Sequence, residues 1–325
     1  MSLSVPNDMS RANIRLFNLG NFARMDWVLS LLVLMLAAIG ILVLYSSNRS
    51  ASTVTGAAPY YLRQLMFIPV GVLLALMIMC IDYRVLVSLG PLFYVALVAL
   101  LVLVMFFGDT AKGATRWLVV GPIRFQPSEQ SKLALIFMLT WYFTTIGNRI
   151  QKLPYFLLTF LIAAVPGILI LKQPSLGTAT TLGPITFAML YIAGCKRWHL
   201  AAIVGAGAVT IPIAWSKVLT PYQRTRVSTI FDPGSDPLGD GYQTIQSMIS
   251  VGSGGASGKG FMESTQTYLS YMPEHHTDFI FSLLAEEWGF LGSTFVVVLF
   301  LLLFYRGLGV AQSSQDLAGA LPAVG

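Results

Sequence analysis

Long apolar segments recur along most of this 325-residue chain. A helix needs about 20 apolar residues to cross the hydrocarbon core of a bilayer. In lipid, only helices and closed barrels satisfy their backbone hydrogen bonds internally, so runs of this length predict a multi-span helical bundle. We therefore predict an all-α integral membrane protein with about eight spans. They are Trp27–Tyr45, Leu65–Ile81, Val85–Phe107, Leu133–Ile146, Phe156–Leu171, Ala179–Ile192, Leu200–Ala214 and Phe279–Tyr305.

The composition agrees with a membrane protein. Charged residues make up 10% of the chain and hydrophobic residues 55%, whereas an ordinary soluble domain is about a quarter charged. The net charge is +6, but no run of Lys and Arg is interleaved with aromatic residues. We therefore expect no nucleic-acid partner.

The short connections between the predicted spans indicate an orientation. Lys and Arg accumulate in the cytoplasmic loops of membrane proteins. A cytoplasmic N-terminus places the connections at 82–84, 147–155 and 194–198 inside the cell. These connections contain Arg84, Arg149, Lys152, Lys196 and Arg197 against one acid, Asp82. We therefore predict a cytoplasmic N-terminus.

This orientation divides the chain into three parts. Residues 1–26 are predicted to form a cytoplasmic tail, and residues 27–305 a transmembrane domain. A large external loop at 216–278 precedes the last span. Residues 306–325 follow that span as a C-terminal tail.

A carboxylate stands at the outer mouth of the last predicted span. Asp278 follows His275 and His276 within the segment Pro273–Phe281 and faces an apolar run. An ionisable residue at the edge of a span is costly to desolvate and is a hypothesis for a functional site. One interpretation is a general base. The other interpretation is an acid at the aqueous edge of the membrane, where its desolvation penalty is small.

A second polar group opens the fourth predicted span. Pro127 favours a helix start, and Glu129 and Lys132, three residues apart, then share one face of that helix. Inside a bundle this pair would neutralise itself and leave a polar site. Alternatively, with Ser128, it caps the helix N-terminus. Upstream, Arg116 is either a site residue or a contact to a lipid headgroup.

The external loop contains two further patterns. Apolar residues recur at helical spacing over Tyr242–Val251, which predicts either an interfacial amphipathic helix or a packed loop helix. The segment Gly252–Gly260 that follows fails the Walker pattern, because Ser253 replaces the first glycine and Gly260 the Ser or Thr. We interpret it as a flexible hinge. The alternative is a turn that brings Lys259 to a lipid pyrophosphate.

The order of these motifs resembles the shape, elongation, division and sporulation family, and most of all its RodA-type branch. The similarity extends from Trp27 to Arg306. Each motif is weak by itself, and the ordered set is specific. The matching segments are Arg116-Trp117, Gln126–Lys132, Gln173–Thr178, Gly239–Gln243, Gln246-Ser247, Gly252–Gly260, Pro273–Phe281 and Glu286–Gly289.

The resemblance implies a peptidoglycan glycosyltransferase that polymerises lipid II into glycan strands during elongation and cell-shape control. It implies a multi-pass protein of the bacterial cytoplasmic membrane with its active site on the external face. Asp278 matches the family's essential aspartate. Substrate-binding roles fall on Arg116, Gln126, Ser128, Glu129, Lys132, Gln246, Ser247, Lys259, His276 and Thr277.

Further expectations follow from the same resemblance. The cofactor would be a divalent cation, Mg²⁺ or Mn²⁺, that stabilises the departing phosphates. The partners would be lipid II, a class B penicillin-binding protein and other membrane proteins of the elongation complex. Two other functions remain open, a lipid II flippase and an inactive scaffold that binds a penicillin-binding protein.

Two positions depart from the family pattern. Ser175 stands where the family usually has Asp in its Gln-Pro-Asp-Leu-Gly-Thr turn, so this corner is expected to lose a polar contact. The family also has ten spans. The closing pair is expected to be absent from a chain that ends at Gly325.

Overall fold

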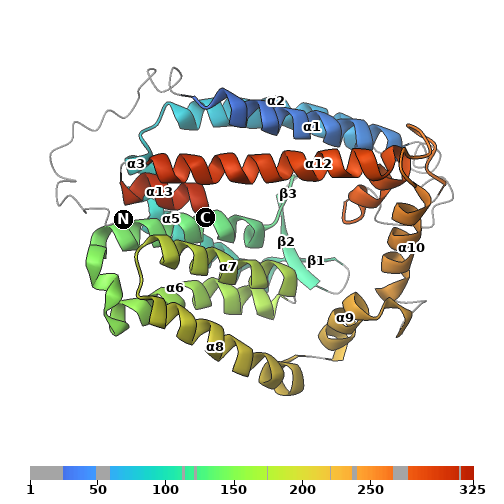
Figure 1. Ribbon diagram of the computed structural model, residues 1–325. Coiled ribbons are helices and arrows are strands. Elements are labelled where there is room, and N and C mark those ends of the chain that lie inside the picture. Colours follow the sequence, from blue (N-terminus) through green and yellow to red (C-terminus); the bar gives the residue numbers. More distant parts are fainter. Residues whose placement is uncertain are drawn as a thin grey trace. The chain divides into compact units, whose positions relative to one another are not determined.

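The computed structural model (Figure 1) describes residues 25–48, 59–111, 114–120, 123–173, 175–219, 221–235, 240–265, 277–314 and 316–325. The chain divides into two compact units. Within the described residues, unit 1 comprises Cys80–Ile211 and Gly307–Gly325, and unit 2 comprises 25–79 and Pro212–Arg306.

The helices agree with the predicted spans. Six of the described helices are long and apolar enough to cross a membrane: α1, α2, α4, α6, α8 and α12. The other two predicted spans are also helical, α5 and the 17-residue α7. The α-helices are α1 (Trp27–Ser47), α2 (Tyr60–Met79), α3 (Tyr83–Ser88), α4 (Gly90–Phe107), α5 (Pro127–Ile146), α6 (Leu153–Lys172), α7 (Leu176–Ile192), α8 (Arg197–Ile213), α9 (Pro221–Phe231), α10 (Asp240–Ser253), α12 (Ile280–Ser313) and α13 (Leu317–Val324).

One predicted span is divided. The single helix expected over Val85–Phe107 is the short α3 followed by α4, with the break at Leu89. Pro91 lies in the first turn of α4. Proline is tolerated there because the amides of a first turn have no helical partner, and it disfavours continuation from the preceding residues.

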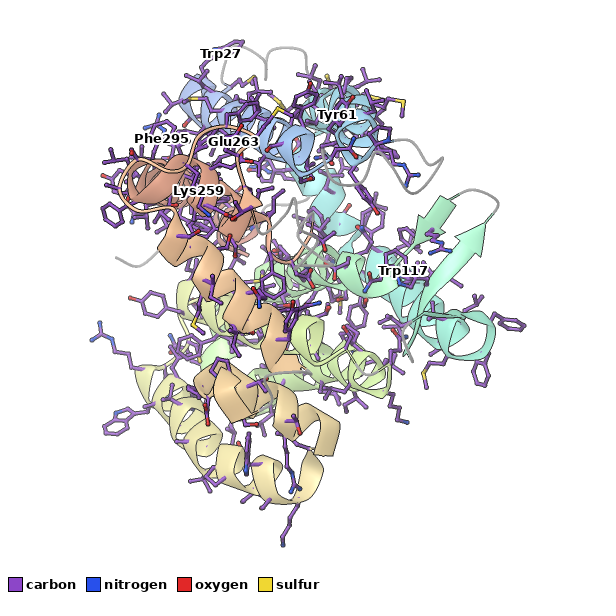
Figure 2. The ribbon with its side chains drawn as sticks, turned by 90° about the vertical axis from the view of Figure 1, so that its right-hand side faces the viewer. Trp27, Tyr61, Trp117, Lys259, Glu263 and Phe295 are labelled. Carbon is purple, nitrogen blue, oxygen red and sulfur yellow. The ribbon has the colours of Figure 1, made fainter. Side chains whose placement is uncertain are left out.

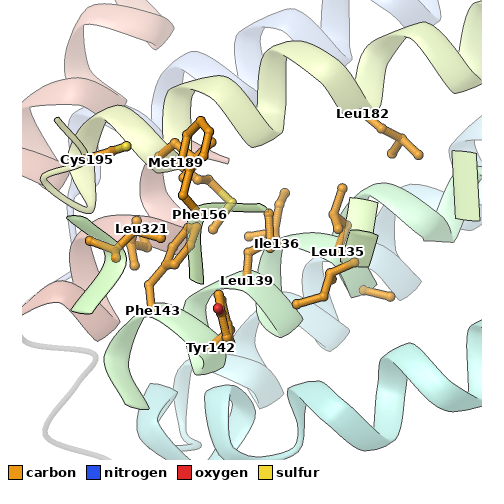
Figure 3. Packing of buried hydrophobic residues seen from close by; sticks show 14 of the residues in the cluster. Leu135, Ile136, Leu139, Tyr142, Phe143, Phe156, Leu182, Met189, Cys195 and Leu321 are labelled. Carbon is orange, nitrogen blue, oxygen red and sulfur yellow. The ribbon is translucent and has the colours of Figure 1, made fainter. Parts of the chain in front are cut away.

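Helix α5 forms the centre of unit 1. Ten of its 20 residues are buried, and α4, α6, α7 and α13 pack around it. Figure 3 shows Leu139 and Phe143 of α5 beside Phe156 of α6 and Met189 of α7. On α4, a Cβ at Gly90 would lie 2.5 Å from the carbonyl oxygen of Phe137, so only glycine allows α4 and α5 to approach so closely.

A small antiparallel sheet follows α4, in a stretch for which the sequence predicted no strands. Its order is β1 (Asp109–Ala111), β2 (Ala114–Val120) and β3 (Ile123–Phe125). In the register, Asp109 is opposite Trp117 and Leu118 is opposite Phe125. The strands are rich in β-branched and aromatic residues, which favour extended backbone.

The structure differs from the prediction after Arg306. Helix α12 continues to Ser313, and α13 buries Leu321 against α5 and α7 within unit 1. Asp316 begins α13, where its Oδ1 accepts a hydrogen bond of 2.9 Å from the Gly319 amide. Its Oδ2 accepts from Tyr83 Oη at 2.9 Å and from Arg84 at 3.1 Å. This segment is therefore a docked helix.

In unit 2, α1 is joined to both α2 and α12. Tyr45 and Tyr61 contact each other edge to face across α1 and α2, with ring centroids 5.1 Å apart. At the other end of α1, Asp26 caps the helix by accepting from the amides of Val28 and Leu29. Its second oxygen lies 2.7 Å from Nε of Arg306 on α12.

Candidate active site

Helix α12 contains a break near its start. Gly289 has φ 66° and ψ −163°, a conformation that is essentially restricted to glycine. In an unbroken helix, the amides of Phe290 and Leu291 would donate to the carbonyls of Glu286 and Glu287. The break thus releases two donors and two acceptors, which must find other partners inside a membrane protein.

The glycine-rich segment supplies those partners. The amides of Phe290 and Leu291 donate to the carbonyls of Gly255 and Ala256, at 2.9 and 3.1 Å. In return, Glu286 and Glu287 accept from the amides of Lys259 and Gly260, both at 3.0 Å. The interpretation of this segment as a flexible hinge is therefore wrong, because its backbone replaces the hydrogen bonds that the helix lacks.

Glycine is required for this close approach. A Cβ at Gly258 would lie 2.0 Å from the carbonyl oxygen of Glu287, and a Cβ at Gly254 would lie 2.1 Å from that of Ala285. At Gly289 it would lie 2.2 Å from the amide nitrogen of Gly258. Gly258 also has a φ of +80°, which residues with a Cβ rarely adopt.

A buried carboxylate lies at the same break. Glu286 has 0% exposure, and its oxygens accept from Ser250, Ser264 and both the amide and hydroxyl of Thr265 at 2.7–3.0 Å. The Lys259 ammonium lies 2.6 Å from Oε1 of Glu286 and 2.8 Å from the Thr265 hydroxyl. Figure 2 labels Lys259 in this region. The ammonium predicted to contact a pyrophosphate is thus already engaged.

Helix α10 places its polar side chains against α12. The hydroxyl of Ser247 lies 2.5 Å from that of Ser282, and Ser250 donates to the Ser282 carbonyl at 3.1 Å. Gln246 is half-buried on the same helix. Met248, Ile249 and Val251 are exposed. The predicted helix is confirmed, and its placement at the lipid interface stays a prediction.

Asp278 and Thr277 lie in the turn immediately before α12, and both are exposed. His276, to which a substrate-binding role was assigned, lies outside the described residues, as do the other residues at 273–275. Asp278 is therefore at the N-terminal end of the short stretch Ile280–Trp288 that precedes the break.

A second polar cluster lies in unit 1, at the start of α5. Lys132 Nζ is 2.8 Å from Oε2 of Glu129, and Thr178 of α7 donates to the other carboxylate oxygen at 3.3 Å. The side chains of Lys132 and Glu129 are 36% and 47% exposed. Ser175 lies 3.1 Å from the Thr178 hydroxyl. Ser175 therefore makes a polar contact of its own at this corner, and the loss of a contact relative to the family's Asp stays a prediction.

Two other predicted residues belong to the same helix start. Gln126 donates to the hydroxyl of Ser128 at 3.0 Å, and Ser128 is fully buried. Arg116 lies on β2 beside Trp117, and the structure does not describe the Arg116 side chain. Gln126, Ser128, Glu129 and Lys132 thus lie together in unit 1.

The sequence patterns indicated no role for Glu286, Glu287 or Thr178. Glu287 is buried, and its Oε1 accepts a hydrogen bond from Ser46 of α1. The sequence does show that two adjacent acids lie inside an otherwise apolar helix. This pattern indicates buried polar contacts, because charged groups need partners in a membrane. Thr178 gave no comparable signal, since Thr is common in such helices.

The described residues contain no group of three or more His, Cys, Asp or Glu side chains placed to hold a metal ion. The divalent cation stays a prediction. In unit 1, a cavity of about 720 Å³ lies between α6, α7 and α8. It is lined almost entirely by apolar side chains, including Phe160, Leu171, Ala179 and Phe187. Ala179 directly follows Thr178, which contacts Glu129.

These features define a multi-pass membrane protein with buried carboxylates, a broken helix and an exposed acid at the start of that helix. The chain belongs to the FtsW/RodA/SpoVE family, described as a cell cycle protein, whose model matches residues 26–325.

Relatives and solved structures agree with this assignment. The chain is 39% identical over 267 residues to the peptidoglycan glycosyltransferase MrdB of Escherichia coli (strain K12). The aligned residues cover 81% of this chain and 71% of that protein. It resembles one chain in the solved structure of a peptidoglycan synthase complex that coordinates polymerization and crosslinking. The TM-score is 0.76 with 31% identity, over 92% of this chain and 82% of that one. For the rod shape determining protein RodA of Thermus thermophilus, the TM-score is 0.65 with 27% identity, over 94% and 81%.

Proposed function

We propose that this protein is a peptidoglycan glycosyltransferase that polymerises lipid II at the outer face of the bacterial cytoplasmic membrane, with its N-terminus in the cytoplasm. The observation that carries the proposal is the match to glycosyltransferase relatives over more than four-fifths of the chain, 81% for MrdB. The exposed Asp278 at the start of α12 supplies a group suited to the chemistry.

Asp278 is the proposed general base. The hydroxyl of an incoming sugar attacks the anomeric carbon of the lipid-linked donor, and the bond from that carbon to the pyrophosphate oxygen breaks. The hydroxyl proton passes to the Asp278 carboxylate, and the polyprenyl pyrophosphate leaves. An α-linked donor that gives a β-linked strand needs a single inversion. No covalent carboxylate intermediate is therefore required.

Unit 1 supplies the proposed substrate-binding groups. The Glu129–Lys132 pair is partly exposed and joined to Thr178, so its polar atoms are accessible to a sugar or phosphate. The cavity between α6, α7 and α8 suits part of the polyprenyl chain, because its lining is apolar and because α6 and α8 are long and apolar enough to cross a membrane. A divalent cation would stabilise charge on the departing phosphates.

The proposed partner is a class B penicillin-binding protein, with other membrane proteins of the elongation complex. The likeness to a chain from a peptidoglycan synthase complex supports this partner. Co-purification of the tagged full chain with the penicillin-binding proteins of its own host would test it. Recovery of no such protein, under conditions that retain other membrane complexes, would contradict it.

Purified protein in lipid nanodiscs, supplied with lipid II, tests the function. Glycan strands longer than the disaccharide are the expected product. Movement of lipid II across the bilayer without strand formation would favour a flippase. Partner binding without either activity would favour a scaffold.

A further inference from the structure

Helix α12, which begins two residues after Asp278, is not a continuous helix. The stretch Ile280–Trp288 is joined to the rest of α12 through Gly289, whose backbone is not helical. The direction of the turn that carries Asp278 is therefore not fixed by the membrane-spanning part of α12. Another contact has to set the angle between the two parts of this helix.

The segment Gly255–Gly260 makes that contact on both sides of the break. Before the break, it donates two amides to the carbonyls of Glu286 and Glu287. After the break, it accepts from the amides of Phe290 and Leu291. Two pairs of hydrogen bonds, one on each side, tie both parts of α12 to one short segment.

The Lys259–Glu286 ion pair holds this segment in place. Glu286 is fully buried and Lys259 is 28% exposed, with 2.6 Å between their charged atoms. Lys259 belongs to the segment and Glu286 to the part of α12 that precedes the break. Removing Lys259 would leave the buried carboxylate of Glu286 without a compensating charge, which is more costly than losing the net attraction of the pair.

We propose that Lys259 and Glu286 are positioning residues that set the angle of the Asp278 turn relative to the spanning part of α12. This inference rests on the proposed function, because the role of Asp278 as general base belongs to it. Glu286 is six residues from the first residue of α12, or about 9 Å along a helix axis at 1.5 Å per residue. Glu286 is therefore proposed to affect Asp278 indirectly, through the position of the α12 backbone. Lys259 is proposed to keep Glu286 and the glycine-rich segment in place through the ion pair.

The experiment compares full-length variants in nanodiscs. Glu286→Gln and Lys259→Met each remove one charge, the double variant removes both, and Lys259→Arg keeps the charge. Arg306→Met is the matched control. It breaks another ion pair of unit 2, between Arg306 and Asp26, with a similar separation of 2.7 Å. Thermal midpoints are measured first, and assays are run at a temperature where every variant stays folded.

Two readouts are then combined. The first is polymerisation of lipid II, separated into kcat and KM. Each single variant should lower kcat by about tenfold with little change in KM, the double variant should recover part of the loss, and Lys259→Arg should stay close to the wild type. The second is hydrogen exchange of peptides that cover Lys259–Gly260 and Phe290–Leu291. Exchange should be faster in the single variants and unchanged in Arg306→Met.

The two readouts separate the possible failures. If the wild type makes no glycan, the proposed function fails, and exchange still reports on the ion pair. If the wild type is active and Glu286→Gln keeps both its kcat and its slow exchange, the positioning role is wrong. If Lys259→Met raises KM and leaves kcat and exchange unchanged, Lys259 contacts the substrate, and the inference is overturned.

Discussion

Lys259 and Glu286, 27 residues apart in sequence, form an ion pair of 2.6 Å at the point where helix α12 is broken. The same backbone segment that contains Lys259 replaces the two hydrogen bonds that the helix loses there. A glycine-rich loop and an acid-containing helix thus form one structural unit, with Asp278 at its edge.

Gly258, which packs against the backbone of α12, should tolerate no side chain. Gly258→Ala should lower the free energy of unfolding by more than about 2 kcal/mol, because its Cβ would meet a backbone carbonyl and its φ is positive. Gly252→Ala is the control, since no atom lies within 4 Å of the added Cβ on α10. Thermal unfolding in detergent measures both. Equal midpoints for the two variants would contradict the tight packing described above.

The Glu129–Lys132 pair should show weak coupling. The sequence left open a pair buried in the bundle or a pair that caps the helix N-terminus, and the side chains of Glu129 and Lys132 are 47% and 36% exposed. Exposed pairs contribute about 0.2–1 kcal/mol, so a double-mutant cycle of Glu129→Gln and Lys132→Met on unfolding should give a value in this range. A coupling of several kcal/mol would indicate a buried pair instead.

Asp26 should make stability depend on acid pH. The amide of Leu29 lowers the pKa of its carboxyl below the usual 3.8, and the guanidinium of Arg306 lowers it further. A lowered pKa means that the contribution is present above the pKa of the unfolded state and is lost as pH falls through that of the folded state. Thermal midpoints from about pH 5 to 3 should therefore fall more steeply for the wild type than for Asp26→Asn. Parallel curves would contradict this.

Filling the apolar cavity should weaken substrate binding. Gly183 lines the cavity and has open space around its Cβ position. Gly183→Leu should raise the KM for lipid II by about tenfold and leave kcat nearly unchanged, since only uniform binding is lost. Gly205→Leu on α8 is the control, because that position is also open and does not line the cavity. Equal KM values for both variants would exclude the cavity as a site for the lipid chain.

The membrane helices could be predicted from sequence because a bilayer imposes both a length and an apolar composition on each span. The predicted element boundaries were least accurate where local residue preferences oppose a continuous helix. Pro91 divides the third span, and β-branched residues form strands near Trp117. The segment after Arg306 consists largely of small residues, which do not by themselves indicate a docked helix, and α13 depends on packing against α5 and α7.

The residues of the site could be predicted only in part. Asp278, Glu129 and Lys132 are charged residues at the ends of apolar segments, which a sequence reveals directly. The glycines of Gly252–Gly260 indicate close approach or flexibility, and sequence alone does not distinguish these. The structure shows that some of these glycines pack closely against backbone carbonyls of α12. The break at Gly289 leaves carbonyls there without helical partners, and this contact depends on tertiary structure.

Asp278→Asn tests the central claim most directly. Asp232→Asn is its control, as another exposed acid of the segment predicted to form the external loop. With both variants in nanodiscs at equal protein concentration, glycan synthesis from lipid II is compared with that of the wild type. Loss of a general base should reduce the rate by about 10²–10⁴-fold for Asp278→Asn and leave Asp232→Asn active. Polymerisation by Asp278→Asn at a rate near that of the wild type would contradict the account.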